Sequence, residues 1–262
     1  MKWIQKSPRA SLALMLVLVL ASAFPALARV RKEVHKSYPM AQDGTVGLRN
    51  VNGNALVKVW NKNEVKIDAV KYADDEDALN QLRIRVTTEG NGIEIETRYP
   101  DQNRRNNDNG ARVDYVITVP RTASLRHFKI VNGKIDIDRV EGKVDASTVN
   151  GEIIASGLSQ SCEFKTVNGK VNAVFSSLPG DAAVKIESVN GPLVVKLPRD
   201  VNATITANVT TGSISNEFGL ETYQESHPHS LVKVGDSLKG KIGDGKADIR
   251  LSAVNGSIRI LK

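Results

Sequence analysis

In this 262-residue chain, four carboxylates are the side chains that could most readily take part in catalysis. They lie close together in the sequence as Asp136, Asp138, Asp145 and Glu152. Pairs of carboxylates cleave glycosidic bonds, one acting as general acid and the other as base or nucleophile. Carboxylates that alternate with lysines are also the ordinary surface of a soluble β protein. We therefore predict no catalytic residue and no enzyme activity, and keep a carbohydrate-active enzyme, a polysaccharide lyase or hydrolase on a β-helix scaffold, as the alternative.

Other reactive side chains are few and scattered. The single cysteine, Cys162, alternates with polar neighbours, so we expect it to be a small buried residue. No internal disulfide can form from one cysteine. The histidines are His35, His127, His227 and His229. The last two flank a proline and have no third ligand nearby in sequence, and no phosphate-binding or metalloprotease motif occurs, so we predict neither a metal nor a cofactor site.

Residues 1–28 have the pattern of a cleaved export signal. A basic leader with Lys2, Lys6 and Arg9 precedes an apolar run, and Ala26-Leu27-Ala28 supplies the small-residue cleavage pattern. The apolar run is shorter than the roughly 20 residues of a membrane-spanning helix. We therefore predict cleavage after Ala28, a periplasmic or cell-surface location, and no transmembrane segment after cleavage.

The net charge does not indicate a nucleic-acid partner. The three basic residues of the leader are part of the formal charge of +7, so the remaining chain carries +4. Nucleic-acid binding proteins usually concentrate their basic residues on one face. We expect the partner to be an envelope component, either a polysaccharide or a protein.

The elements that would position any site are set by an internal repeat. The triplet Val-Asn-Gly or its Thr-Thr-Gly variant recurs, and each glycine is followed two places on by an aliphatic residue. The triplets begin at Val51, Val131, Val149, Val167, Val189, Thr210 and Val254. Asn-Gly is also the usual signal of a two-residue hairpin, which would give an antiparallel meander. The half-way corners differ, Glu141-Gly142 in one repeat and Ser159-Gln160 in the next, which favours a stack of 18-residue turns with two strands each.

The repeat therefore predicts an all-β fold, a right-handed β-helix-like solenoid of 18–22-residue turns. Glycine suits the tight corner, and the asparagine amides of stacked corners can hydrogen-bond to one another. Three aliphatic columns are expected to face inward. The first is Ile135, Ile153, Val171, Leu193, Ile214 and Ile258; the second is Ile137, Ala155, Ala173, Val195 and Ile260; the third is Val131, Val149, Val167, Val189, Val209 and Val254.

We expect three segments: the signal at 1–28, an N-terminal β region at 29–124 continuous with the solenoid, and the Val-Asn-Gly repeat solenoid at 125–262. Residues 29–43 are predicted to be a ragged lead-in or a single covering strand. Alternating segments at 44–71, 84–88, 93–99 and 113–119 predict strands. Clustered acids ahead of Ala78, Leu79 and Leu82 predict one short helix over 74–82. The wholly polar segment 101–110 predicts a hairpin tip.

The residues of this repeat resemble a known group. The Val-Asn-Gly-x-Ile corners, the segment Val113 to Pro120 and the closing Ile242-Gly243-Asp244-Gly245 resemble the bacterial domain-of-unknown-function family labelled "putative adhesin". The resemblance covers residues 44–261 and implies a right-handed β-helix-like fold on an exported protein. It implies no catalytic or cofactor residue. We therefore expect a non-enzymatic envelope protein that presents a rigid β surface for adhesion, binding or scaffolding, and that can also associate end to end.

Overall fold

The computed structural model describes residues 29–99, 110–224 and 235–262. Within them the chain forms one short helix and one 19-stranded sheet, so the predicted all-β class with a single short helix is confirmed. Three predicted features lie outside the described residues: the signal segment, the hairpin tip up to residue 109, and the pair His227 and His229. No helix in the described part of the chain is long and apolar enough to cross a membrane.

The N-terminal part contains seven strands and the helix, and each predicted element is present. The elements are β1 (Val30–Pro39), β2 (Thr45–Asn52), β3 (Ala55–Trp60), β4 (Glu64–Ala73), α1 (Glu76–Gln81), β5 (Arg83–Glu89), β6 (Gly92–Arg98) and β7 (Arg112–Pro120). β1 pairs along its whole length with β4 in antiparallel register. Of the two alternatives predicted for residues 29–43, the structure therefore shows the single covering strand.

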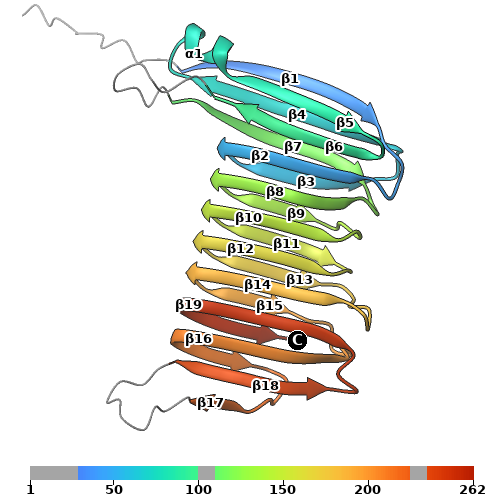
Figure 1. Cartoon of the computed structure of the whole chain (residues 1–262), viewed down its shortest axis with the longest axis vertical. Coiled ribbons are helices and arrows are strands. Elements are labelled where there is room, and N and C mark those ends of the chain that lie inside the picture. The colour runs from blue at the N-terminus through green and yellow to red at the C-terminus, as the bar shows by residue number, and fades with distance from the viewer. Residues whose placement is uncertain (1–28, 100–109, 225–234) are drawn as a thin grey trace, which may run out of the picture.

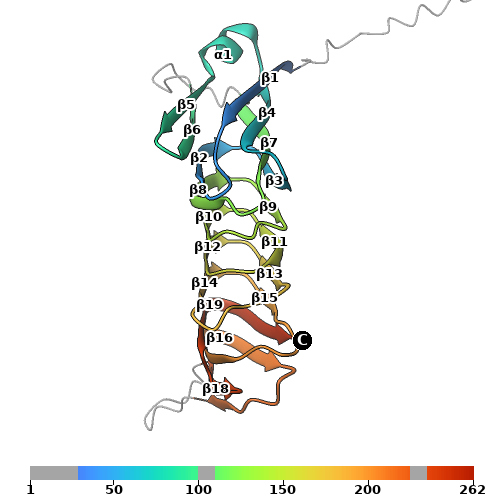
Figure 2. The same ribbon diagram turned by 90° about the vertical axis from the view of Figure 1, so that its right-hand side faces the viewer.

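The repeat region follows as alternating strands of two parallel ladders. The strands are β8 (Ser124–Asn132), β9 (Ile135–Asp138), β10 (Val144–Asn150), β11 (Ile153–Leu158), β12 (Cys162–Asn168), β13 (Val171–Phe175), β14 (Ala183–Asn190) and β15 (Leu193–Lys196). β8, β10, β12 and β14 pair in parallel, as do β9, β11, β13 and β15. The two ladders stand on opposite sides of the elongated molecule (Figure 2). Parallel pairing at the 18-residue spacing excludes the antiparallel meander.

The prediction of a right-handed β-helix-like solenoid is wrong. The described strands form a single mixed sheet, in which β1–β4, β4–β7, β5–β6, β16–β18 and β17–β18 are antiparallel. The antiparallel strands lie at both ends of the molecule, where residues between the triplets are too many for one 18-residue unit (Figure 1). Extra residues there return the chain alongside itself, and the return reverses the direction of the strand.

The order of strands in space also departs from the order in the sequence. The last elements are β16 (Ala203–Asn216), β17 (Thr222–Gln224), β18 (Asp236–Ile242) and β19 (Ala247–Leu261). β19 lies between β14 and β15 on one side and β16 on the other, so the final triplet is inserted before the Thr-Thr-Gly copy (Figure 1). At the other end β2 and β3 pair with β8 and β9, although 71 residues separate Asn52 from Ser124 in numbering.

The core lies between the two ladders. Every member of the first predicted column is buried, and every member of the second is fully buried. We call the first, Ile135, Ile153, Val171, Leu193, Ile258 and Ile214 in spatial order, the inner column. The third column is wrong, because its valines at 131, 149, 167, 189 and 254 are 38–42% exposed. Only Val209 is buried, and it aligns with Ala253 rather than with Val254.

The error arises because the corner changes which residues, even-numbered or odd-numbered, point inward. Along β8 the even-numbered Phe128 and Ile130 point inward, whereas after Gly133 the odd-numbered Ile135 and Ile137 do so. Simple alternation carried through the corner therefore places the preceding valine on the wrong side. The Asn-Gly pair turns the chain at the edge of the sheet, and this turn exchanges inward for outward positions.

Candidate binding face

The Asn-Gly corners form a row of asparagines along one edge of the two ladders. Each amide nitrogen donates to the amide oxygen of the next asparagine, at 2.8 to 2.9 Å, and all donors point toward the N-terminal end. In spatial order the row is Asn52, Asn132, Asn150, Asn168, Asn190 and Asn255. The predicted asparagine ladder is confirmed. We call the two strands that one corner joins a level. The row holds neighbouring levels in register, because a slip of one residue would break every amide contact.

Close approach of backbones explains the glycine at each corner. A Cβ placed on Gly133 would collide with the carbonyl oxygen of Gly53, and one on Gly151 would collide with that of Gly133. The same holds for Gly169 against Gly151. Glycine at the corner therefore meets two requirements, the backbone conformation of a tight turn and the close approach of the neighbouring corner.

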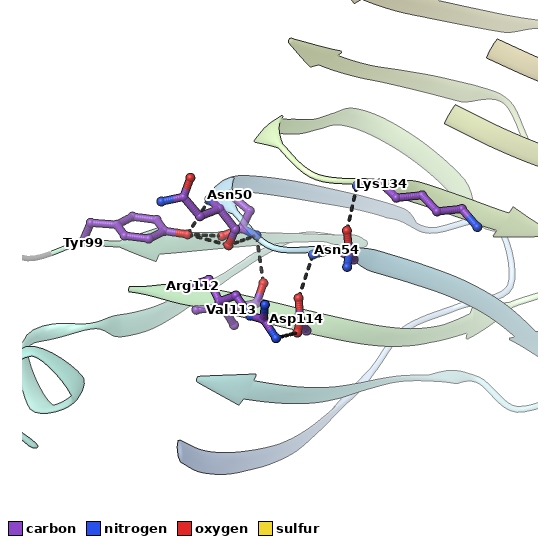
Figure 3. A network of polar contacts seen from close by, with 8 residues as sticks. Asn50, Asn54, Tyr99, Arg112, Val113, Asp114 and Lys134 are labelled. Carbon is purple, nitrogen blue, oxygen red and sulfur yellow. Dashed lines mark hydrogen bonds and ion pairs between the residues drawn. The ribbon is translucent and has the colours of Figure 1, made fainter. Parts of the chain in front are cut away.

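A polar network closes the N-terminal end of the row (Figure 3). Tyr99 Oη donates to Asn50 Oδ1 at 2.7 Å and accepts from the backbone nitrogen of Asn52 at 2.8 Å. The Asn50 amide nitrogen donates to the Val113 carbonyl at 3.0 Å. Burial raises the pKa of Tyr99 to about 12, so its hydroxyl remains a donor at neutral pH. This network has a structural role: it joins β6 and β7 to the repeat levels.

A second set of contacts in the same network ties three levels together. The backbone nitrogen of Asn54 donates to Asp114 Oδ1, and the Asn54 side chain accepts from the Lys134 backbone, each at 2.9 Å (Figure 3). Arg112 forms an ion pair with Asp114 at 3.3 Å. The N-terminal end of the repeat is therefore anchored by side chains.

The outward side of β8, β10, β12, β14 and the first half of β19 carries the valines that were expected inside. We call this surface the valine face; its ladder lies in front of β9, β11, β13 and β15 in Figure 1. Six valines, one at each Val-Asn-Gly triplet, form the valine stripe. Five lie along the edge of this face, Val131, Val149, Val167, Val189 and Val254, and the sixth, Val51, lies on β2, which pairs with β8. Among the described side chains, no other large hydrophobic residue is exposed to this degree. A contiguous exposed apolar patch marks an interaction surface more often than scattered single residues do.

Charged side chains of both signs lie beside the stripe. Glu163 and Lys165 on β12 stand next to Lys185 and Glu187 on β14, a group that we call the charged cluster. Lys165 Nζ lies within 4 Å of both glutamates, as does Lys185 Nζ. The hydrogen bond from Lys165 holds the pKa of Glu163 below its usual range. The cluster is a checkerboard, in which each charge has an opposite charge as neighbour along and across the strands.

Two grooves run over the valine face. One, of about 550 Å³, lies over the stripe between Val131 and Val254 and includes Lys165 and Glu187. The other, of about 660 Å³, lies over the opposite half of the same strands and includes Glu163, Lys185 and Arg250. Together they make this side of the molecule the candidate site for a partner, with an apolar half and a charged half.

The four carboxylates considered for catalysis are divided between the two ladders and a corner. Asp136 and Asp138 lie on β9, Asp145 lies on β10 in the other ladder, and Glu152 lies at a corner. Asp136 pairs with Lys134, Asp138 with Arg139, and Glu152 with Lys170. Asp145 accepts a hydrogen bond from the backbone of His127. Each of the four carboxylates is therefore held by a basic side chain or a backbone donor beside it.

The other titratable candidates lie apart from the valine stripe, one in the core and one on β1. Cys162 is buried as predicted, and burial raises the pKa of its thiol. His35 lies 2.7 Å from Asp68 on the exposed surface. No group of three or more metal-ligating side chains occurs in residues 29–99, 110–224 and 235–262.

Sequence reasoning missed one buried charge, Lys71. Its ammonium donates to the carbonyls of Leu79 and Leu82, at 3.0 and 2.7 Å, where α1 ends. Burial lowers the pKa of Lys71. The opposite end of α1 is capped by Asp75, whose side chain accepts from the Ala78 backbone at 2.7 Å. Lys71 therefore satisfies helix carbonyls and is not available for chemistry.

Comparison with known proteins supports the fold. No protein-family model and no curated protein matches the chain. The structure is similar to that of a putative cell adhesion protein from Clostridium sporogenes, with a TM-score of 0.53 and 17% identity over 88% of this chain and 99% of that one. A putative adhesin from Bacteroides fragilis is more distant, with a TM-score of 0.34 and 10% identity over 88% of this chain and 97% of the other. At 17% identity the likeness to the clostridial protein shows that the two share a fold.

Proposed function

We propose that this protein is a non-enzymatic, exported binding or adhesion protein of the cell envelope, and that the valine face is its binding surface. The observation that carries the proposal is the exposed valine stripe, placed by the repeat on a flat ladder beside a charged cluster. A stripe of six exposed valines on a soluble protein is costly to keep unless a partner covers it.

The rigidity of the face supports the same function. The asparagine row and the Tyr99 network hold the levels in register, so the outward side chains are positioned before any partner arrives. A pre-organised surface loses less conformational entropy on binding than a mobile one. The predicted export signal and the name of the clostridial structural relative agree with a role in adhesion at the envelope.

A binding experiment with matched variants tests the proposal. Purified protein is incubated with envelope fractions and with a glycan array, and the retained protein is measured. A Val149→Lys and Val167→Lys double variant is expected to lose most of its binding, because two charges interrupt the middle of the stripe. Val194→Lys, a change on the outward side of β15 in the other ladder, is the control and is expected to bind normally.

Two results would contradict the proposal. Equal binding by the native protein and the stripe variant would show that the valine face is not the binding surface. Saturable cleavage of an envelope polysaccharide by the purified protein would show that it is an enzyme.

A further inference from the structure

We infer that the partner of the valine face is a second copy of this chain, which packs face to face about a two-fold axis parallel to the strands and midway between β12 and β14. This inference rests on the proposed function, because it takes the valine face to be a binding surface. The pattern of charges on that face is complementary to itself under this rotation.

The rotation places β12 opposite β14 of the second copy and β10 opposite β19. The rotation leaves the position of each residue along the strand direction unchanged, because the axis runs parallel to the strands. Glu163 then faces Lys185, and Lys165 faces Glu187 of the other copy. Asp145 faces Arg250 by the same register. Each pair occurs twice across the axis, so every charge of the charged cluster meets an opposite charge.

The remaining positions are compatible with this arrangement. Val167 faces Val189, and Val149 faces Val254, so the four central valines of the stripe meet valines of the second copy. Val131 faces Thr210 by the same register. At the margin the basic residues of β8 face Thr206 and Asn208 of β16, which are uncharged. The rotation thus brings apolar residues onto apolar residues and places no like charges opposite each other among these columns.

The other two-fold axis in the plane of this face is less suitable. An axis perpendicular to the strands, between the two columns of the charged cluster, would still set Glu163 opposite Lys165 of the second copy. It would also place Val149 over Lys143 and Val254 over Asp248, because the stripe lies at one end of the strands. Burying a charge against an apolar side chain without a partner is unfavourable.

The size of the face fits a weak, reversible dimer. The strands that overlap under this rotation are β8, β10, β12, β14, β19 and β16. Six strands about 4.8 Å apart and about seven residues long give a contact area of roughly 24 by 23 Å. This area, roughly 550 Å², is below the about 800 Å² per partner of a standard stable interface. We therefore expect a dimer that forms in the micromolar range or above. A two-fold interface closes at two copies and does not extend into a filament.

Charge reversal with mixing tests the inference. Sedimentation equilibrium is measured for the native protein, for Glu163→Lys, for Lys185→Glu, and for an equimolar mixture of the two variants. Either variant alone sets like charges opposite each other twice, so its dimer is expected to weaken about tenfold or more. In the mixture, each variant residue again faces an opposite charge, so the mixed dimer is expected to form. Asp136→Lys, a charge reversal on β9 in the other ladder, is the control and should leave the dimer unchanged.

The outcomes separate this inference from the proposed function. A native protein that stays monomeric up to millimolar concentration overturns the inference, while loss of envelope binding in the stripe variant would still support the proposed function. A dimer that resists both single variants, or one that fails to re-form in the mixture, excludes the proposed axis. A mass that grows without limit with concentration would indicate end-to-end association instead, and would overturn the inference as well.

Discussion

The inner column and the valine stripe flank the same row of corners and have opposite environments. Both consist of aliphatic residues with the same period, one two places after each glycine and the other two places before it. Ile153 is fully buried, whereas Val149 is 39% exposed. The aliphatic repeat therefore has two environments in this fold: one column packs between the ladders, and the other lies exposed on the valine face.

The largest expected effect distinguishes the two columns directly. Ile153→Ala should lower the free energy of unfolding by about 2–5 kcal/mol, because it leaves a cavity between two stacked residues. Val149→Ala should lower it by less than about 1 kcal/mol, because the side chain already meets water. Urea unfolding midpoints measure both. Equal losses would mean that the stripe is part of the core.

A second change tests the corner that separates the columns. Gly151→Ala should cost more than about 1 kcal/mol, because its Cβ would collide with the carbonyl of Gly133 and push the levels apart. Loss of register should then expose the neighbouring core. Thermal unfolding followed by circular dichroism gives the size of the effect. An unchanged midpoint would argue that the corners do not approach each other as closely as described.

A smaller effect is expected for the asparagine row. Asn150→Ala removes one donor and one acceptor, to Asn132 and from Asn168. We expect a loss of about 1 kcal/mol, since the amides left without partners are exposed to water. Asn172→Ala, on the outward side of β13, is the matched control. If the control and the variant have the same urea midpoint, the row contributes nothing to stability.

The smallest effect concerns the charges beside the stripe. The pKa of Glu163 is lowered, first by its hydrogen bond from Lys165, so its contribution to stability is present above the ordinary carboxyl pKa and is lost as pH falls through the folded-state pKa. Because the side chain is 41% exposed, this contribution is no more than about a few tenths of a kcal/mol. The difference in unfolding free energy between native protein and Glu163→Gln should be larger at pH 7 than at pH 3, at concentrations below dimer formation. A constant difference would show that the ion pairs do not stabilise the folded chain.

Much of the fold could be predicted because its signals are local. Alternation along single strands located β2 to β7, and the acids ahead of Ala78 located α1. The 18-residue spacing predicted parallel stacking and the asparagine row, because identical corners must align if levels of equal length are stacked. The burial of Cys162 followed from its position between polar residues on one strand.

The errors arose where distant parts of the chain decide the outcome. β19 follows β18 in the sequence but lies on the other side of β16, between β16 and β14. No local sequence pattern indicates this position. The antiparallel strands at both ends overturned the right-handed β-helix-like solenoid for the same reason. Lys71 was missed because its partners are the carbonyls of a helix that begins five residues later, and a side chain's reach across a turn is not visible in periodicity.

By itself, the amino-acid sequence determined the repeat: which residues are aliphatic, where the corners lie, and that the asparagines align. Only the tertiary structure decided which aliphatic column is exposed, because the corner exchanges inward for outward positions and alternation within a strand cannot record that exchange. The facing charges of β12 and β14 likewise become a pattern only when the two strands lie side by side. The sequence therefore shows the regular spacing of the valines, and the packing of the strands places these valines on one surface.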